Sequence, residues 1–470
     1  MKKIILAVFL SAFMLCGCSH KLKPAKSFET IEFSDLKFDL RDGFEESEDG
    51  AYIYDLNYEA EFSFSKFFQR TMEPEVIVSY LNIIYDDEEQ VTSDILEWND
   101  YEVAYNVFEV ENDEEGELKT PQYSRFSFSC CGSAYFFSVY HDSSDRKAVK
   151  ELAEEIFESL EYTGEYTAPE AVEKIENEFI SVDVDENWSL FGEIGKDSSI
   201  RFSYENIDSL AKIISSVRIE DYTAGEYDTI KEYGDAYYKK SRTNEKDIVK
   251  KPEKTSIFGC NAVKLERSRD LGTDILKYDE TVYFFEKGGV IHKLTIKINN
   301  QDGCDEVKKD IEKLLKSITV KEISKERQEE IEAAKITDYE TEHFKFSLSS
   351  YYELNKESHF DGLDFYNIQV TECESDPDKK PKELAEDIAD EMYGYYIYDE
   401  DVELGCGAKR IDKNVYAIAA KLTDDGDEVC FVYDNGVNAL KVVADVDIEE
   451  ADDVFDNKKL MEMLGSVEAK

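Results

Sequence analysis

The 470-residue chain is poor in glycine, proline, histidine and tryptophan, with 22, 7, 5 and 2 of them respectively. Its low glycine and proline content excludes collagen-like, flexible-linker and proline-rich chains. Basic residues are also scarce, with 55 Lys and Arg against 107 Asp and Glu, a net charge of −52. This balance excludes the basic surface that nucleic-acid binding requires. No apolar run reaches the length of a membrane-spanning helix, so we expect no transmembrane helix.

The familiar catalytic and cofactor-binding motifs are absent as well. There is no Gly-x-Ser-x-Gly nucleophile elbow, no His-Glu-x-x-His motif and no glycine-rich phosphate loop. The acidic runs at residues 112–116 and 424–428 lack the spacing of a calcium-binding loop. We therefore predict no catalytic residues, no metal site and no cofactor.

The chain does have the composition of a folded protein. Apolar residues make up 42% and aromatic residues 13%, which argues against disorder in spite of the charge. The length corresponds to about three domains. We therefore expect several hydrophobic cores.

The N-terminus carries an export signal. Two lysines precede an apolar run at residues 4–15, which is too short to span a membrane and is typical of a secretory signal. The run ends in Leu15-Cys16-Gly17-Cys18, which resembles the lipobox of bacterial lipoproteins. The resemblance implies cleavage between Gly17 and Cys18 and a diacylglyceryl group on Cys18, whose two acyl chains anchor the protein stably. A plain secretory signal with coincidental cysteines is the alternative.

These features predict a location and two N-terminal segments. Residues 1–17 are expected to be a lipoprotein signal peptide and residues 18–27 a tether. The mature chain is expected at the extracytoplasmic face of the bacterial cell membrane, held by lipidated Cys18.

The seven other cysteines of the mature chain match no zinc-binding spacing, and they do not suggest a disulfide framework in a chain of this length. These are Cys130, Cys131, Cys260, Cys304, Cys373, Cys406 and Cys430. Most lie in apolar runs, which favours buried, unpaired thiols. The adjacent pair Cys130-Cys131 leaves a vicinal disulfide or redox site as the alternative.

Three stretches of the chain follow the same order of expected elements. Each opens with a short alternating strand, at residues 36–40, 179–184 and 344–348. Each closes with a strand that follows a glycine and with an amphipathic helix that ends in serine, at Ser159, Ser317 and Ser466. A helix is also expected in the middle of each stretch, marked by Val91, Ile95 and Trp98, by Tyr227, Ile230, Gly234 and Tyr237, and by Leu384, Ile388, Met392 and Tyr395 behind Pro381.

This order of elements resembles the PsbP-like fold. The resemblance implies an α+β protein of three similar domains, each an antiparallel sheet with a mid helix and a C-terminal amphipathic helix. It also implies an accessory or binding role without catalytic residues. We predict the three PsbP-like repeats at residues 28–165, 172–322 and 337–470, with a charged helical linker at residues 323–336 between the second and the third.

The expected domains differ in charge. Residues 28–165 and 337–470 have net charges of −27 and −22, whereas residues 172–322 have only −6. The middle domain contains a run of basic residues, comprising Lys239, Lys240, Arg242, Lys246, Lys250, Lys251 and Lys254. This predicted patch could dock either an acidic neighbouring domain or an anionic envelope polymer. The alternative is that it is simply a solvated helix end and loop.

The sequence thus predicts a non-catalytic binding or accessory lipoprotein of unknown ligand. Its expected partners are the membrane, through Cys18, and an envelope protein or anionic polymer, but no nucleic acid. The alternative is an envelope hydrolase with an unrecognised carboxylate site, which a carboxyl group of raised pKa beside a basic residue would reveal.

Overall fold

A computed structural model describes most of the chain. The described residues are 22–47, 50–68, 70–84, 89–110, 118–164, 172–191, 199–242, 247–270, 277–355, 363–365, 367–393, 402–404, 409–412, 414–422, 426–445 and 458–470. The predicted signal peptide, the cleavage site at Gly17 and Cys18, the lipidated Cys18 and the start of the tether lie outside them.

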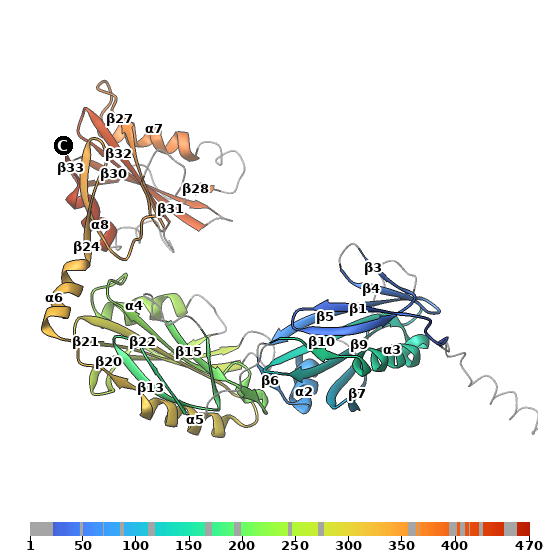
Figure 1. Ribbon diagram of the computed structural model, residues 1–470. Helices are drawn as coiled ribbons and strands as arrows, with labels where there is room; N and C mark the ends of the chain where they lie inside the picture. The colour runs from blue at the N-terminus through green and yellow to red at the C-terminus, as the bar shows by residue number, and fades with distance from the viewer. Residues whose placement is uncertain are drawn as a thin grey trace, which may run out of the picture. The chain divides into compact units, whose positions relative to one another are not determined.

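The described chain is a mixed α/β protein with antiparallel sheets and seven α-helices (Figure 1). It divides into two compact units, of which the second comprises Tyr222–Tyr233, Glu286–Ile291 and Glu322–Lys470. No helix among the described residues is long and apolar enough to cross a membrane. In sequence order the chain has a first, a middle and a last part, each with one small and one large sheet.

The first part has a three-stranded and a seven-stranded sheet. The small sheet has the order β1-β2-β11, with β1 at Phe28–Phe33, β2 at Leu36–Arg41 and β11 at Glu161–Tyr162. The large sheet has the order β3-β4-β5-β10-β9-β8-β7, with β3 at Phe44–Glu46, β4 at Tyr52–Asp55, β5 at Glu59–Phe68, β7 at Glu89–Trp98, β8 at Tyr101–Glu109, β9 at Pro121–Cys130 and β10 at Ser133–Asp142. The helices are α2 at Pro74–Ile84 and α3 at Arg146–Glu158.

The two helices of the first part pack on the large sheet through different sets of residues. Alternation along β8 directs Val103, Tyr105 and Val107 into one aromatic core together with Phe157 of α3. Ala104 and Phe108, on the other face, pack instead against α2. The strands are therefore apolar on both faces, because a helix covers each face.

The middle part has a three-stranded and an eight-stranded sheet. The small sheet has the order β12-β13-β23, with β12 at Val172–Glu176, β13 at Ile180–Asp185 and β23 at Thr319–Val320. The large sheet has the order β14-β15-β17-β22-β21-β20-β18, and β19 also pairs with β20. Its strands are β14 at Trp188–Phe191, β15 at Ser199–Tyr204, β17 at Ser216–Tyr222, β18 at Ile248–Val249, β19 at Glu253–Ile257, β20 at Cys260–Asp270, β21 at Lys277–Lys287 and β22 at Val290–Asn299. The helices are α4 at Ile230–Ser241 and α5 at Cys304–Ser317.

The first and middle parts share a hydrophobic contact within the first compact unit. A short parallel pair joins β6, at Thr71–Met72, to β16, at Asn206–Ile207. Ile207 and Ile213 join Ile77 of α2 in one buried cluster. The second face of the first large sheet is thus completed by residues from the middle part.

The last part has a three-stranded and a seven-stranded sheet, and the charged helix α6 at Lys325–Ala334 precedes it. The small sheet has the order β24-β25-β33, with β24 at Ile336–Glu340, β25 at Phe344–Ser349 and β33 at Glu468–Ala469. The large sheet has the order β26-β27-β32-β31-β30-β28, and β29 also pairs with β30. Its strands are β26 at Leu363–Phe365, β27 at Ile368–Glu374, β28 at Val402–Leu404, β29 at Lys409–Asp412, β30 at Val415–Leu422, β31 at Gly426–Asp434 and β32 at Asn438–Asp445. The helices are α7 at Pro381–Tyr393 and α8 at Lys458–Ser466.

One expected helix is wrong. Residues Val91, Ile95 and Trp98 lie in strand β7, and the helix of the first part is α2, which begins earlier at Pro74. The spacing of the three apolar residues imitates a helix, but Trp98 contacts Phe126 of the same sheet, with ring centroids 5.7 Å apart. The expected mid helices of the other two parts are found as α4 and α7, although Tyr227 precedes α4 and Tyr395 lies outside the described residues.

The serine that ends each closing helix ties that helix to the small sheet. The Ser159 hydroxyl donates to the Ile156 carbonyl at 3.0 Å and accepts from the Asp39 N–H of β2 at 2.9 Å. Ser466 accepts in the same way from the Ser347 N–H of β25 at 2.8 Å. Ser317 donates to carbonyl oxygens of α5 and β13. A single hydroxyl thus fixes where each helix ends on its strand.

Replacing Ser159 with alanine should therefore loosen the first part by about 1 kcal/mol, the typical contribution of one such hydrogen bond. The Asp39 amide loses its acceptor, so its hydrogen exchange should accelerate about fivefold. Hydrogen exchange of the β2 amides measures this change. Unchanged exchange at Asp39 would contradict the role of the hydroxyl.

Candidate functional site

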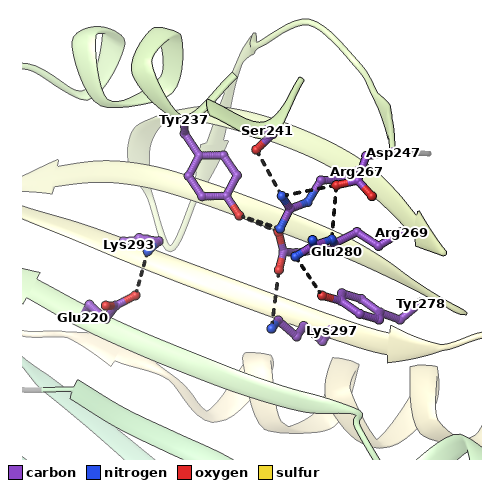
Figure 2. A network of polar contacts seen from close by, with 10 residues as sticks. All are labelled: Glu220, Tyr237, Ser241, Asp247, Arg267, Arg269, Tyr278, Glu280, Lys293 and Lys297. Carbon is purple, nitrogen blue, oxygen red and sulfur yellow. Dashed lines mark hydrogen bonds and ion pairs between the residues drawn. The ribbon is translucent and has the colours of Figure 1, made fainter. Parts of the chain in front are cut away.

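Charged side chains gather on the face of the large middle sheet that α4 partly covers (Figure 2). Tyr237 and Ser241 lie four residues apart on α4, and both reach this face. Strand register supplies the rest, because Arg267 lies opposite Glu280 and Arg269 lies opposite Tyr278 on β20 and β21. Alternation along these strands places all four side chains on one face.

Arg267 is the centre of this polar network. Its Nη2 lies 2.6 Å from Glu280 Oε1 and donates to the Tyr237 hydroxyl at 3.3 Å. Its Nη1 donates to Ser241 Oγ at 3.3 Å and lies 3.6 Å from Asp247 Oδ2. One guanidinium therefore joins α4, β20, β21 and the segment before β18.

The acids of the network are deeply buried. The side chains of Asp247 and Glu280 are only 1% and 3% exposed. Asp247 also lies 3.1 Å from Arg269 Nε, and its Oδ1 has no hydrogen-bond partner among the described residues. Burial, and then the charge of Glu280, raise the pKa of the Tyr237 phenol, which therefore remains protonated and donates to Glu280. The arginines thus compensate carboxylates that would otherwise be very costly to bury.

Two lysines extend the network across β22. Lys293 Nζ lies 3.0 Å from Glu220 Oε2, and Lys297 Nζ lies 3.7 Å from Glu280 Oε2. Burial lowers the pKa of Lys297, and the nearby cations, of which Arg201 has the largest effect, lower it further against the opposing effect of Glu280. Positive charges therefore outnumber negative charges around Lys297.

Two more arginines continue the positive charge across the sheet. Arg201 of β15 lies directly opposite Arg218 of β17. Arg218 pairs with Glu220 at 3.2 Å, but Arg201 forms no ion pair with any residue that the structure describes. Like charges that face each other across two strands are destabilising. We name Arg201, Arg218, Arg269, Lys293 and Lys297 the cationic face.

The predicted patch does not form this site. Lys239 and Lys240 lie in the last turn of α4, Lys250 follows β18, and Lys254 lies on β19, while Lys246 is outside the described residues. Lys250 pairs with Glu266 at 2.6 Å. Arg242 stacks on Tyr238, with its guanidinium carbon 5.5 Å from the ring centroid, and Lys251 is exposed. These residues border β20 from several elements, and whether they bind a partner stays a prediction.

The sequence contained one signal for the cationic face that composition alone did not reveal. Basic residues two or four apart in strand-like runs, as in Arg267-Ser268-Arg269 and at Lys293 and Lys297, share one face of a strand. Arg201 and Arg218 could not be joined to them without the strand register. Among the described residues, no group of three or more His, Cys, Asp or Glu is placed to hold a metal ion.

No protein-family model matches the chain, and no curated protein matches it. Its fold is similar to the solution structure of cyanobacterial PsbP (CyanoP) from Synechocystis sp. PCC 6803, at 11% identity and a TM-score of 0.23, over 34% of this chain and 96% of that chain. It is also similar to the immunity protein TplEi from Pseudomonas aeruginosa, at 9% identity and a TM-score of 0.20, over 63% of this chain and 99% of that chain. The TM-scores are low, so these similarities carry no inference about activity.

Proposed function

We propose that the chain is a lipid-anchored extracytoplasmic protein that acts as a non-catalytic binding or accessory module. We further propose that its cationic face binds a ligand that presents several carboxylate or phosphate groups. The observation that carries this proposal is Arg201, which forms no ion pair with a described residue and lies opposite Arg218, in a chain whose net charge is −52. An anion bound between these arginines would attract both guanidinium groups and offset their mutual repulsion.

The surroundings of Lys297 support the same ligand chemistry. Its side chain is 36% exposed, so solvent covers only part of it. Its pKa is lowered by burial and by the charges of Arg201, Arg267 and Arg269, and a bound anion would offset the repulsion from these arginines. Arg201 is also exposed. Ligand binding and protonation of Lys297 should therefore favour each other.

We also propose that residues 28–165, 172–322 and 337–470 are three copies of one PsbP-like domain. The support is topological. Each has a three-stranded sheet whose middle strand pairs with a two-residue strand from the end of that stretch. In each, a serine at the end of the closing helix bonds the backbone of that middle strand.

A hydrolase remains only the alternative prediction from the sequence. Among the described carboxyl groups with a shifted pKa, including Asp35, Asp142, Glu266 and Glu372, every shift is downward. A general acid needs the opposite shift. No observation therefore favours a hydrolase over a binding protein.

The proposed site is tested by removing two of its cations. The full chain, purified in detergent, is applied to immobilised polyglutamate and to immobilised polyphosphate at low and high salt. We expect the Arg201→Gln/Lys297→Gln variant to lose at least tenfold in affinity, because each lost charge-assisted contact contributes about 1.5 kcal/mol or more. High salt should weaken the unmodified chain in the same direction.

The matched control is Lys251→Gln/Lys254→Gln, which removes the same charge from the predicted patch. We expect this control to bind like the unmodified chain. Equal losses in both variants would mean that binding follows net charge alone and would overturn the proposed site. A loss confined to the control would move the site to the predicted patch. The two polymers show which anionic group is preferred.

A further inference from the structure

The two adjacent cysteines of the first part lie at the tip of a tight hairpin. Strands β9 and β10 pair up to Cys130 opposite Ser133, which leaves only Cys131 and Gly132 in the loop. Both loop residues have positive φ, 47° and 77°. This is the conformation of a two-residue hairpin turn that matches the twist of the strands.

The turn brings the two thiols together. In an extended strand, neighbouring side chains point to opposite faces. Here the positive φ of Cys131 brings its sulfur to 3.6 Å from that of Cys130. Cys131 is exposed, whereas Cys130 is half-buried with the Tyr101 hydroxyl 4.0 Å from its sulfur.

We propose that Cys130 and Cys131 are a redox-active dithiol that closes to a vicinal disulfide when a low-molecular-weight disulfide oxidises it. The exposed Cys131 thiolate attacks one sulfur of the small disulfide, whose S–S bond breaks and releases one small thiol. The Cys130 thiolate then attacks the Cys131 sulfur and releases the second small thiol. The pair loses two protons and two electrons, and the small disulfide is reduced to two thiols.

The order of the two steps follows from accessibility. An oxidant reaches Cys131 from solvent, while the half-buried Cys130 is shielded from it. Burial, and then the adjacent Cys131, raise the pKa of Cys130 to about 11, which makes it a poor first nucleophile. Once Cys131 carries the mixed disulfide, Cys130 needs no encounter, because the sulfurs move only from 3.6 Å to about 2.05 Å. Proximity therefore favours ring closure over a lasting mixed disulfide.

The test uses the full chain in detergent, with oxidised glutathione as the oxidant. Remaining thiols are alkylated before digestion, and peptides are identified by mass spectrometry. We expect the peptide with Cys130 and Cys131 to lose two hydrogen atoms and to resist alkylation. Cys304, which has no adjacent cysteine in the sequence, is the internal control and should show only alkylation or a mixed disulfide.

Two variants separate the proposed steps. The Cys130→Ser variant should accumulate a stable mixed disulfide at Cys131, because its resolving thiol is gone. The Cys131→Ser variant should react at least about tenfold more slowly, because only the shielded thiol remains. A lasting mixed disulfide at Cys131 in the unmodified chain would overturn the proposal, as would a pair that stays fully alkylatable. None of these outcomes depends on the ligand of the cationic face.

Discussion

Replacing Arg267 with alanine should destabilise the middle part by about 3–5 kcal/mol, the usual cost of removing one partner from a buried ion pair. The Glu280 side chain is only 3% exposed, and in the variant its carboxylate loses the 2.6 Å contact to the guanidinium. Tyr237 and the more distant Lys297 are its only other contacts in the network. Asp247 keeps its contact with Arg269, so the main stranded charge is that of Glu280.

Hydrogen exchange of the β20 and β21 amides is the suitable measurement, because it reports on the middle part of a multidomain chain. The control is Arg218→Ala, whose side chain is 48% exposed beside Glu220 and should contribute less than about 1 kcal/mol. The double variant Arg267→Met/Glu280→Met removes both charges and should recover much of the loss. Equal effects of Arg267→Ala and Arg218→Ala would refute the central role of Arg267.

The first part should lose stability as the pH falls from 6.5 towards 4, and His141 is a principal cause. Its ring is fully buried, with Nε2 2.8 Å from Ser124 Oγ and Nδ1 2.8 Å from the Asp142 carbonyl. Burial lowers the pKa of His141 from 6.5 to about 4. Below pH 6.5 the unfolded chain binds a proton that the folded chain excludes, so acid favours unfolding. The shift corresponds to about 3 kcal/mol, present above pH 6.5 and lost by pH 4.

The His141→Gln variant should flatten this pH dependence, because glutamine does not titrate. Urea unfolding between pH 4.5 and 7 can be followed by the fluorescence of Trp98, in a Trp188→Phe background that leaves one tryptophan. The carboxyl of Asp142 should add little to the slope in this range, because its ordinary pKa is 3.8 and its pKa in the folded chain is lower. Burial raises the pKa of its carboxyl, but hydrogen bonds from Ser144 and from the Thr120 and Lys119 amides outweigh this and lower it. An unchanged slope in the variant would exclude His141 as a cause.

The closing helices were predictable from the sequence because the apolar pattern of each one lies within a single continuous segment. The apolar stripe through Val149, Leu152 and Ile156 matches the buried side of α3, and Ser159 caps that helix as expected. Helix α2 was missed because its buried residues Val76, Ile77 and Leu81 span fewer than two helical turns. Pro74 at its first position was the available signal.

The cationic face could not be predicted from the sequence because it is a product of register. Arg201 and Lys297 are almost a hundred positions apart, and only the strand order brings them to one surface. The run from Lys239 to Lys254 can be recognised in the sequence because its residues are close together in the chain. Its cations instead lie on separate elements, and Lys250 is neutralised by Glu266.

The small sheets also determine how the chain would respond to mechanical load between its ends. In the first part, β1 pairs with β2 along six residues, whereas β11 pairs with the same strand along only two. Both pairings are antiparallel, so their hydrogen bonds lie across the strands and a pull along them acts in shear. The two-residue strands β11, β23 and β33 are the weakest of these clamps. Under tension they should slip first and lengthen the chain slightly, while the large sheets keep their register.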